Sequence, residues 1–366
     1  MKISDIIYTL ESFAPPAYQE SYDNAGLITG NSSWDCTGII CALDATEAVV
    51  EEAVKKGCNL IVAHHPIVFG GLKKITGKNY VEQTIIAAIK QDIAIYAIHT
   101  NLDNVMAGVN SRIADKLGLE NRTILQPKPA QLVKLCTFVP DEQADAVRNA
   151  LFAAGAGHIG NYSEASFNTD GIGTYKANER ANPYAGKAGK RHEEPEVKIE
   201  VLLPAYLQNS LVKALLAAHP YEEVAYDLVP LANANKEVGS GLVGQLPQPL
   251  TEVELLHKLK ASFGLSVVRH TPLLQKPVST IALCGGAGSF LTKAAIAAGA
   301  QVFITADVKY HEFFDANNQL VIADIGHWES EQFTIDLLFD ILIAKFPTFA
   351  VQKTEVRTNP VYYFCQ

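Results

Sequence analysis

The hydrophobic positions in the first third of the chain form short apolar runs separated by longer amphipathic stretches. The runs at 37–43, 59–63 and 93–98 are almost wholly apolar, as strands buried on both faces of a parallel sheet are. Helical spacing of apolar residues predicts helices at 46–56, around 80–90 and around 108–117. Strand, helix and strand in this rhythm predict a parallel α/β sheet with right-handed crossovers.

The same rhythm returns in the last third of the chain. Apolar runs predict strands at 279–284, 301–305 and 320–323. Amphipathic spacing predicts helices at 290–298 and 329–345, the second closed by Pro347. Two final strands are expected at 348–356 and 361–364.

The middle third has a different pattern, with prolines near both of its ends. Its elements are expected as a strand at 131–140, a helix at 141–154, strand-like pieces such as 162–167, a strand at 197–203, a helix at 206–218 and a strand at 223–229. The segment 185–196 is polar and expected to be mobile. Strand-helix-strand, repeated once, is the ferredoxin-like order. We therefore predict an inserted domain at 129–232, within an outer α/β domain made of 1–128 and 233–366.

Composition narrows the class of protein. The chain has 366 residues, of which 48% are hydrophobic and 19% charged, enough apolar material for more than one full core. The net charge of −9 argues against a general nucleic-acid binder. No apolar run approaches the ~20 residues that span a bilayer. An acid close to Met1 argues against a signal peptide, and six cysteines without a CxxC pair indicate reduced thiols, so a cytoplasmic location is expected.

Histidines and carboxylates cluster just after three of the predicted strands. HH lies at 64–65, HTNLD at 99–103 and HWESE at 327–331. This is the edge where open α/β sheets bind ligands. A single histidine there would more often be an ordinary hydrogen-bonded residue, but the three motifs together favour a metal site. The candidate ligands are His64, His65, Asp103, His327 and Glu331. Imidazole and carboxylate without cysteine favour zinc, iron or manganese.

The spacing of His327 and Glu331 also indicates how many ions such a site holds. At i and i+4 both side chains leave one helix face and can reach one centre. A carboxylate such as Glu331 can bridge two ions, the arrangement of two-metal hydrolytic sites. Glu331, Asp103 and His311 are the candidate catalytic residues. His311 could shuttle a proton near neutral pH, or it could belong to a solvated helix start. His99 is expected to orient Asp103 or to bind substrate.

Two further motifs have structural explanations that compete with functional ones. CGGAGS at 284–289 could present backbone N–H groups to a phosphate. It matches neither of the phosphate-binding glycine patterns, so a tight strand-to-helix turn is the favoured interpretation. The polar group of His219, Tyr221, Glu222 and Glu223 could bind a small regulator, but a role in packing is favoured.

These residues resemble a known family. The matching stretches of the outer domain are DNAGL at 23–27, HHPIVF at 64–69, HTNLD at 99–103, GGAGS at 285–289 and GHWESE at 326–331. The chain resembles the Nif-three-like dinuclear metal centre hexameric proteins, often named GTP cyclohydrolase I type 2 homologues. The middle third resembles the PII/CutA-like lobe of the long form, at GHIGNYSEASF (157–167), GIGTY (171–175), NPYAG (182–186) and HPYEEVAY (219–226).

The resemblance implies a fold, an assembly and a metal content. It implies two like α/β halves, a toroidal homohexamer built as a trimer of dimers, and two divalent metal ions per chain. His65 and Asp103 would hold one ion, His64 and His327 the other, and Glu331 would bridge them.

Two functions remain open from the sequence. The first is a metal-dependent hydrolase that uses a metal-activated water on a nucleotide-like substrate, although no base-reading motif is present. The second is a non-catalytic metal-binding ring that senses a metabolite or regulates a partner through its PII-like lobe. Membrane association is not expected, and nucleic acid is the least favoured partner.

Overall fold

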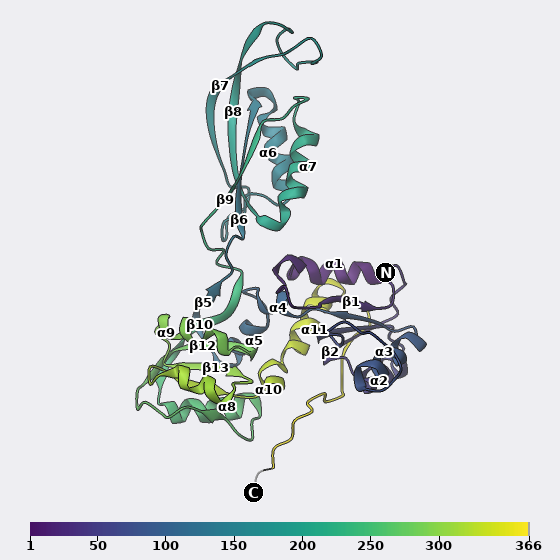
Figure 1. The fold of residues 1–366 in the computed structure, drawn as a ribbon, viewed down its shortest axis with the longest axis vertical. Helices are drawn as coiled ribbons and strands as arrows, with labels where there is room; N and C mark the ends of the chain where they lie inside the picture. Colours follow the sequence, from purple (N-terminus) through teal and green to yellow (C-terminus); the bar gives the residue numbers. More distant parts are fainter. Residues whose placement is uncertain (365–366) are drawn as a thin grey trace. The chain divides into compact units, whose positions relative to one another are not determined.

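The computed structural model describes residues 1–364, which form two compact units, so Cys365 lies outside the described residues. Unit 1 contains residues 1–127 together with the chain from 236 onward, and unit 2 contains residues 128–235. The chain therefore leaves unit 1 once, folds unit 2 and returns (Figure 1). Within residues 1–364, no helix combines the length and apolarity needed to span a membrane.

The first sheet of unit 1 has five strands in the order β1, β4, β3, β2, β15. Their bounds are Gly26–Thr29, Ala94–Ala97, Leu60–His65, Ile39–Asp44 and Val351–Lys353. Only β1 runs antiparallel to its neighbour. Alternate residues of β3 enter different hydrophobic clusters, Leu60 and Val62 one and Ile61 and Ala63 the other. Both faces are thus buried, which explains why these strands are continuous apolar runs.

The second sheet of unit 1 has six strands in the order β11, β14, β13, β12, β10, β5. Their bounds are Arg269–His270, Val321–Asp324, Val302–Ala306, Val278–Ala287, Gly239–Leu250 and Glu120–Pro127. Only the β12–β13 and β13–β14 pairs are parallel, so the expectation of a parallel sheet is wrong for the other three pairs of this sheet. The difference arises because β5, β10 and β11, which the apolar runs did not reveal, extend the parallel core by antiparallel pairing.

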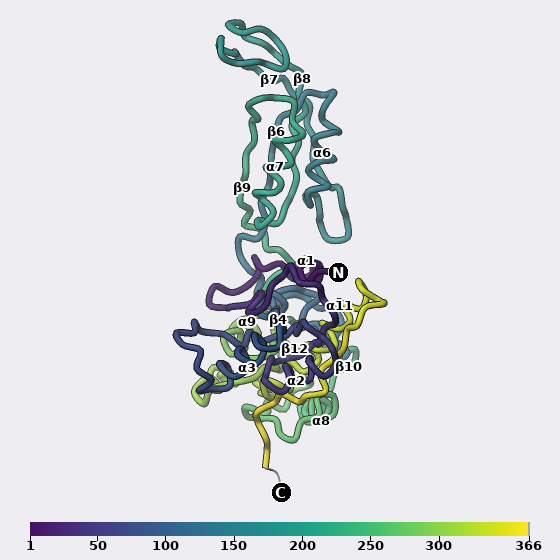
Figure 2. The backbone as a smooth tube through the Cα atoms, turned by 90° about the vertical axis from the view of Figure 1, so that its right-hand side faces the viewer, coloured from purple at the N-terminus to yellow at the C-terminus, as the bar shows by residue number. Residues whose placement is uncertain are grey.

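The helices of unit 1 surround these sheets. They are α1 (Ile3–Phe13), α2 (Glu47–Lys55), α3 (Tyr80–Lys90), α4 (Thr100–Asp103), α5 (Val109–Leu117), α8 (Glu252–Phe263), α9 (Thr292–Ala297), α10 (His327–Glu331) and α11 (Thr334–Lys345). The largest hydrophobic cluster takes residues from α1, α5, α8, α11 and both sheets, and a smaller cluster covers the other face of each sheet. Figure 2 traces the same backbone from the side.

Unit 2 has the order β6 (Leu132–Pro140), α6 (Ala144–Ala153), β7 (Ser166–Lys176), β8 (Arg191–Pro204), α7 (Gln208–Ala218) and β9 (Tyr226–Pro230). The strands form an antiparallel sheet in the order β7, β8, β6, β9. Apolar residues of β6, β8, α6 and α7 make a separate core. The predicted strand-helix-strand order of this region is confirmed. Short 3-10 turns complete the chain at Pro16–Tyr18, Asp141–Gln143, Ala205–Leu207, Ser289–Leu291 and Tyr310–Ala316.

Three local predictions are wrong. The helix predicted at 329–345 is two helices, because the chain breaks at Gln332, whose side-chain amide donates to the carbonyls of Phe263 and Glu329. The strand predicted at 361–364 does not form, since no neighbouring strand pairs with it. The polar segment 185–196 is ordered in its second half, where Arg191 pairs with Lys176 at the start of β8.

Candidate metal centre

The histidines and carboxylates of the three sequence motifs converge in unit 1. β3 ends with His64 and His65, and the chain after β4 carries His99 and α4. After β14, Gly326 turns the chain with φ +89° into α10, which begins at His327. Three groups of side chains have ligand atoms within 4.8 Å of one another: His64, His65 and His99; His65, His327 and Glu331; and His64, Asp103 and Glu331.

One side of this cluster is fully buried. The Nδ1 of His64 donates to the Ile98 carbonyl at 2.9 Å, which leaves Nε2 with its lone pair 3.5 Å from Oδ1 of Asp103. Burial lowers the pKa of His64 to about 3, so its ring is neutral. Neither His64 Nε2 nor Asp103 Oδ1 has a hydrogen-bond partner among the described residues. Burial and the nearby Glu331 carboxylate raise the pKa of Asp103, and two such buried atoms are destabilising unless a proton or a metal ion lies between them.

The other side of the cluster consists of two imidazoles held by carboxylates. The Nδ1 of His65 donates to Asp44 at 2.7 Å, and the Nδ1 of His327 donates to Asp307 at 2.7 Å. Their Nε2 atoms lie 2.9 and 3.1 Å from the same Oε2 of Glu331. A carboxylate on Nδ1 fixes the ring and makes Nε2 a better metal ligand.

The electrostatics of this side show how closely the groups are coupled. Burial by itself would lower the pKa of His65, but hydrogen bonds to Asp44 and Glu331 outweigh it and raise the pKa to about 10. Burial would likewise lower the pKa of His327, but the carboxylates of Glu331 and Asp307 outweigh it and raise this pKa to about 11. Without a bound metal, the imidazoles of His65 and His327 therefore hold protons. A bound divalent ion would supply the positive charge in place of these protons.

Glu331 belongs to both the buried and the carboxylate-backed groups. Its side chain is buried, its Oε2 faces His65 and His327, and its Oε1 lies 3.9 Å from His64 Nε2. Burial acts to raise its pKa, but the two imidazoles hold it well below the usual range. One oxygen toward each group suits a bridging carboxylate. The resemblance pairs His65 with Asp103 and His64 with His327, whereas the distances here group His65 with His327 and His64 with Asp103.

His99 lies closer to the centre than the sequence interpretation places it. Its Nδ1 donates to Asp23 at 2.8 Å, and Asp23 also accepts the Thr100 backbone N–H at 3.0 Å. Asp23 therefore holds the ring of His99 in place. Because the ligand atoms of His99, His64 and His65 lie within 4.8 Å of one another, His99 is a further candidate ligand.

The glycine-rich end of β12 makes room for Glu331. Gly286 has φ +61°, and a Cβ there would lie 2.4 Å from Oε1 of Glu331. The N–H of Gly286 donates to Ser330 at 3.0 Å, and that of Gly288 donates to Thr305 at 2.9 Å. Since these N–H groups are used within the protein, the interpretation as a tight turn is favoured over phosphate binding.

A pocket of about 520 Å³ borders the carboxylate-backed side of the cluster. Its lining includes His65, His327, Trp328, Tyr363 and Arg269. The Arg269 guanidinium pairs with the buried carboxylate of Asp324 and lies 5.5 Å from the centre of the Phe313 ring. The pocket is therefore aromatic beside the candidate metal ligands, and its lining of Asp44, Asp307, Asp324 and Glu329 against Arg269 is acidic before any metal ion is bound.

The sequence interpretation missed two residues here and included one that the structure places elsewhere. Asp44 directly follows the apolar run of β2, so the rule that found His64 could also have found it. Arg269 does not follow an apolar run of this kind, so no comparable sequence pattern marks it. His311 lies in the 3-10 turn, where its ring contacts Tyr310 and Phe314, neither of which belongs to the cluster.

Fold and site together define a mixed α/β protein with a candidate metal centre of histidines and carboxylates. The profile of the family described as Duf34/NIF3 (NGG1p interacting factor 3) matches residues 1–360, and the chain belongs to this family.

Individual relatives agree with this assignment. A Halalkalibacterium halodurans protein named "GTP cyclohydrolase 1 type 2 homolog" is 40% identical over 332 residues, 89% of each chain. A Bacillus subtilis protein of the same name is 37% identical over 325 residues, 88% of this chain and 87% of that one. Among solved structures, a Bacillus cereus protein related to NIF3 is 36% identical, with a TM-score of 0.86 over 100% of this chain and 99% of its own.

Proposed function

We propose that this protein is a hydrolase that depends on two divalent metal ions per chain. The observation that carries the proposal is the pair of buried atoms without partners, His64 Nε2 and Asp103 Oδ1, 3.5 Å apart beside Glu331. A cation bound by all three residues would satisfy both atoms. A second ion would have as ligands the imidazoles of His65 and His327 and the other carboxylate oxygen of Glu331.

The donor set fits zinc, iron or manganese. All atoms in the three groups are imidazole nitrogens and carboxylate oxygens. Cys284 is nearby, but its buried thiol is directed to the Gly285 carbonyl at 3.4 Å, and burial raises its pKa, so it remains a neutral thiol. Asp44 and Asp307 would orient His65 and His327 toward the metals.

The chemistry follows from the donors and from the neighbouring pocket. Two bound divalent ions lower the pKa of a coordinated water and so supply a nucleophile at neutral pH. The chain's own residues hold the imidazoles through Asp44 and Asp307 and bind the substrate. The Arg269 guanidinium is placed to bind an anionic group, and Trp328 and Tyr363 offer aromatic faces to a planar one.

A nucleotide-like substrate is the class that we propose for this pocket, with the bound metal ions offsetting the carboxylates of its lining. A nucleotide combines an anionic phosphate with a planar base, which matches Arg269 and the two aromatic side chains. The relatives' name, "GTP cyclohydrolase 1 type 2 homolog", points to the same class. Glu331 and Asp103 are the residues proposed for the reaction itself, through the metal ions that they would hold.

The test is a combined metal and turnover experiment. Elemental analysis of the protein reconstituted separately with zinc, iron and manganese should find two ions per chain. Each form is then offered nucleoside triphosphates, with formate and phosphate release measured. Arg269→Met should raise the KM for a nucleotide more than it lowers kcat. Fewer than two ions per chain after full reconstitution contradicts the dinuclear site.

The architecture of unit 2 supports a second candidate function, the sensing of a small ligand without catalysis. Its antiparallel sheet with two helices is the architecture expected of a PII/CutA-like lobe, a class that senses small ligands. We propose a homohexamer, a trimer of dimers, as the assembly of the chain. Light scattering tests the hexamer. If the hexamer carries two metals per chain but turns over no nucleotide in any metal form, the non-catalytic sensor is the better description.

A further inference from the structure

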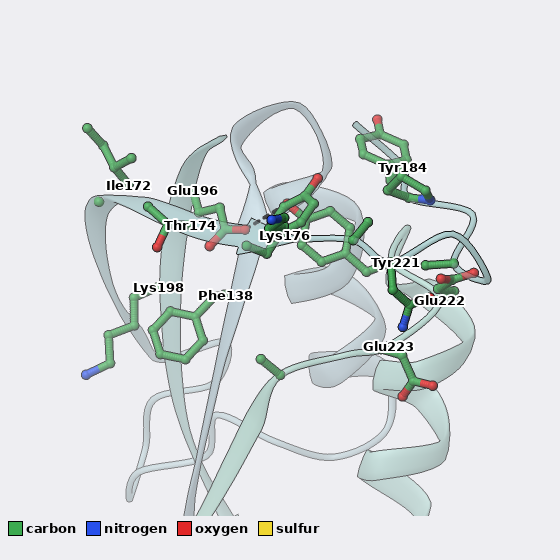
Figure 3. Close-up of a pocket in the computed structure, with 18 of the residues that line it drawn as sticks. Phe138, Ile172, Thr174, Lys176, Tyr184, Glu196, Lys198, Tyr221, Glu222 and Glu223 are labelled. Atoms are coloured by element: carbon green, nitrogen blue, oxygen red, sulfur yellow. Dashed lines mark hydrogen bonds between the residues drawn. The ribbon is translucent and has the colours of Figure 1, made fainter. Parts of the chain in front are cut away.

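Unit 2 contains a pocket that the metal centre does not use. It measures about 700 Å³, within the range of small-molecule sites, and every lining residue lies between 138 and 225. Its walls come from β7, from the loop that follows β7, from β8 and from the turn after α7 (Figure 3). The pocket is thus a property of unit 2 alone.

Aromatic rings form much of the lining. Tyr221 lies at the centre of this group, with its ring 6.0 Å from that of Tyr175 and 5.9 Å from that of Tyr184. The interplanar angles of 66° and 50° direct the rings toward a common space rather than stacking them. Phe138 adds a further ring to the lining. Several ring faces around one space are the arrangement that binds organic cations.

Tyr221 and the loop around Tyr184 are held in place from outside the pocket. The backbone N–H of Tyr221 donates to Nδ1 of His219, whose Nε2 donates to the Phe138 carbonyl at 2.9 Å. The Glu222 carboxylate accepts the backbone N–H of Asn182 at 3.0 Å, which fixes the loop that carries Tyr184. The favoured packing role of His219 is consistent with these contacts, and the aromatic group does not depend on a ligand to form.

A buried carboxylate faces the same space. Glu196 of β8 lines the pocket but is only 8% exposed, and its Oε1 accepts the Tyr221 hydroxyl at 2.7 Å. Burial and this hydrogen bond raise the pKa of Tyr221, so the hydroxyl remains a donor. A side chain at Gly173 would lie 2.1 Å from Oε2 of Glu196, so only glycine leaves the carboxylate room.

Glu196 has no ion-pair partner among the described residues. Of the two lysines that line the pocket, Lys198 pairs with Glu200 at 3.0 Å, and its ammonium points away from Tyr221 in Figure 3. The remaining lysine, Lys176, faces a lining that also contains Asp170, Glu222 and Glu223. The lining is therefore net negative, and a buried carboxylate without a counter-ion is costly.

We propose that this pocket binds an organic cation, an ammonium group that carries methyl or methylene carbons, with Glu196 as its counter-ion and Tyr175, Tyr184 and Tyr221 around it. A neutral ligand would leave Glu196 unpaired, and an anion would meet four carboxylates. A bare metal ion is disfavoured because the groups of potential metal ligands found within residues 1–364 all lie in unit 1.

The experiment compares choline with its uncharged isostere 3,3-dimethyl-1-butanol on the full-length protein by isothermal titration calorimetry. The two probes have the same shape, so their difference measures the charge. We expect choline to bind at least about tenfold more tightly than the alcohol, as desolvated cation–aromatic contacts would give. Equal affinity for the two probes, or no choline binding at millimolar concentration, overturns the proposal.

Variants separate the cation site from general stability. Glu196→Gln should weaken choline binding at least about tenfold. The matched control is Glu193→Gln, which removes the same charge from an exposed position of β8 outside the lining and should bind choline as the unchanged protein does. Choline binding by Glu196→Gln equal to that of the control overturns the proposal.

Two further variants keep the test decisive if Glu196→Gln does not fold. Tyr184 is 48% exposed, so Tyr184→Ala should fold and should still weaken choline binding several-fold. Lys176→Met removes a competing positive charge and should strengthen it. If Lys176→Met abolishes choline binding, Lys176 supports the ligand instead of competing with it, and the proposal is wrong.

Discussion

The metal centre of unit 1 and the pocket of unit 2 both bury a carboxylate, but they surround it with different chemistry. Glu331 contacts two imidazoles, each backed by a further carboxylate, whereas Glu196 contacts one phenolic hydroxyl among aromatic rings. Imidazole lone pairs suit a metal ion, and aromatic faces suit an organic cation. The comparison teaches that the neighbours of a buried carboxylate decide which positive charge it will accept.

The two sites also differ in how the backbone places them. The metal centre forms where parallel strands of both sheets of unit 1 end, with β3 and β4 in the first sheet and β14 in the second, so the edges of two sheets meet at the site rather than one. The pocket of unit 2 forms beside an antiparallel pair, β7 and β8, and is closed by a loop. The first site is therefore visible as motifs in the sequence, and the second is not.

The largest expected effect comes from Glu331→Gln, because Glu331 belongs to both proposed ion sites. We expect the variant to lose most of both metals on reconstitution, measured by elemental analysis per chain. The control is Glu51→Gln, which replaces an exposed carboxylate on α2, and this variant should retain two ions. Choline binding by unit 2 should survive in Glu331→Gln, which distinguishes loss of the centre from unfolding. Two tightly bound ions in the variant would contradict the bridging role.

Asp103→Asn should separate the two halves of the centre. Asp103 belongs to the group with His64 but not to the group with His65 and His327. We therefore expect one ion per chain to be lost and one to be kept. Elemental analysis after dialysis measures the ratio. Loss of both ions would contradict a centre in which Asp103 serves one ion only.

Asp307→Asn should weaken the centre without emptying it. The Asp307 carboxylate orients His327 through Nδ1 but is not itself a proposed ligand. Loss of such support lowers metal affinity by about 10–100-fold. A chelator competition titration measures the change in metal affinity. Asp315→Asn, at an exposed position of the 3-10 turn Tyr310–Ala316, serves as the control. Unchanged affinity would show that Asp307 does not orient His327.

Gly286→Ala tests how the end of β12 makes room for Glu331. At φ +61° alanine is strained, and its Cβ would also lie 2.4 Å from Oε1 of Glu331. Gly118→Ala is the matched control, since Gly118 has φ +66° and open space around it. The control should lose about 1–2 kcal/mol of unfolding free energy from the backbone alone, and Gly286→Ala should lose more. Equal losses in urea titrations would mean that Glu331 moves away freely.

The smallest expected effect is a pH dependence confined to unit 2. Burial lowers the pKa of His219 below its usual value, so the folded state binds fewer protons than the unfolded state below about pH 6.5. The contribution of neutral His219 to the free energy of unfolding is therefore complete above about pH 6.5. It is lost as the pH falls toward the pKa that His219 has in the folded state. Hydrogen exchange in β6 should quicken on acidification from pH 7 to 5, and His219→Gln should flatten this trend. An identical trend in the variant would exclude His219 as the cause.

The sequence predicted the central strands of unit 1 because each is buried on both faces and therefore reads as a continuous apolar run. β2, β3 and β4 are such strands. By contrast β10 carries glycines and prolines, and β5 is mostly exposed, so neither shows that pattern although both extend the second sheet. The break at Gln332 depends on the Phe263 carbonyl, which lies far away in sequence.

The sequence by itself determined which residues can bind a metal and that they follow apolar strands. Local patterning is sufficient there because polar residues just after buried strands lie where α/β sheets bind ligands. Only the tertiary structure decided that the ends of two different sheets meet at the site, that His65 lies with His327, that Asp44 and Asp307 hold them, and that Glu196 meets Tyr221 in unit 2. Those side-chain contacts join residues 20 to 262 positions apart, and the chain's packing rather than its periodicity sets such distances.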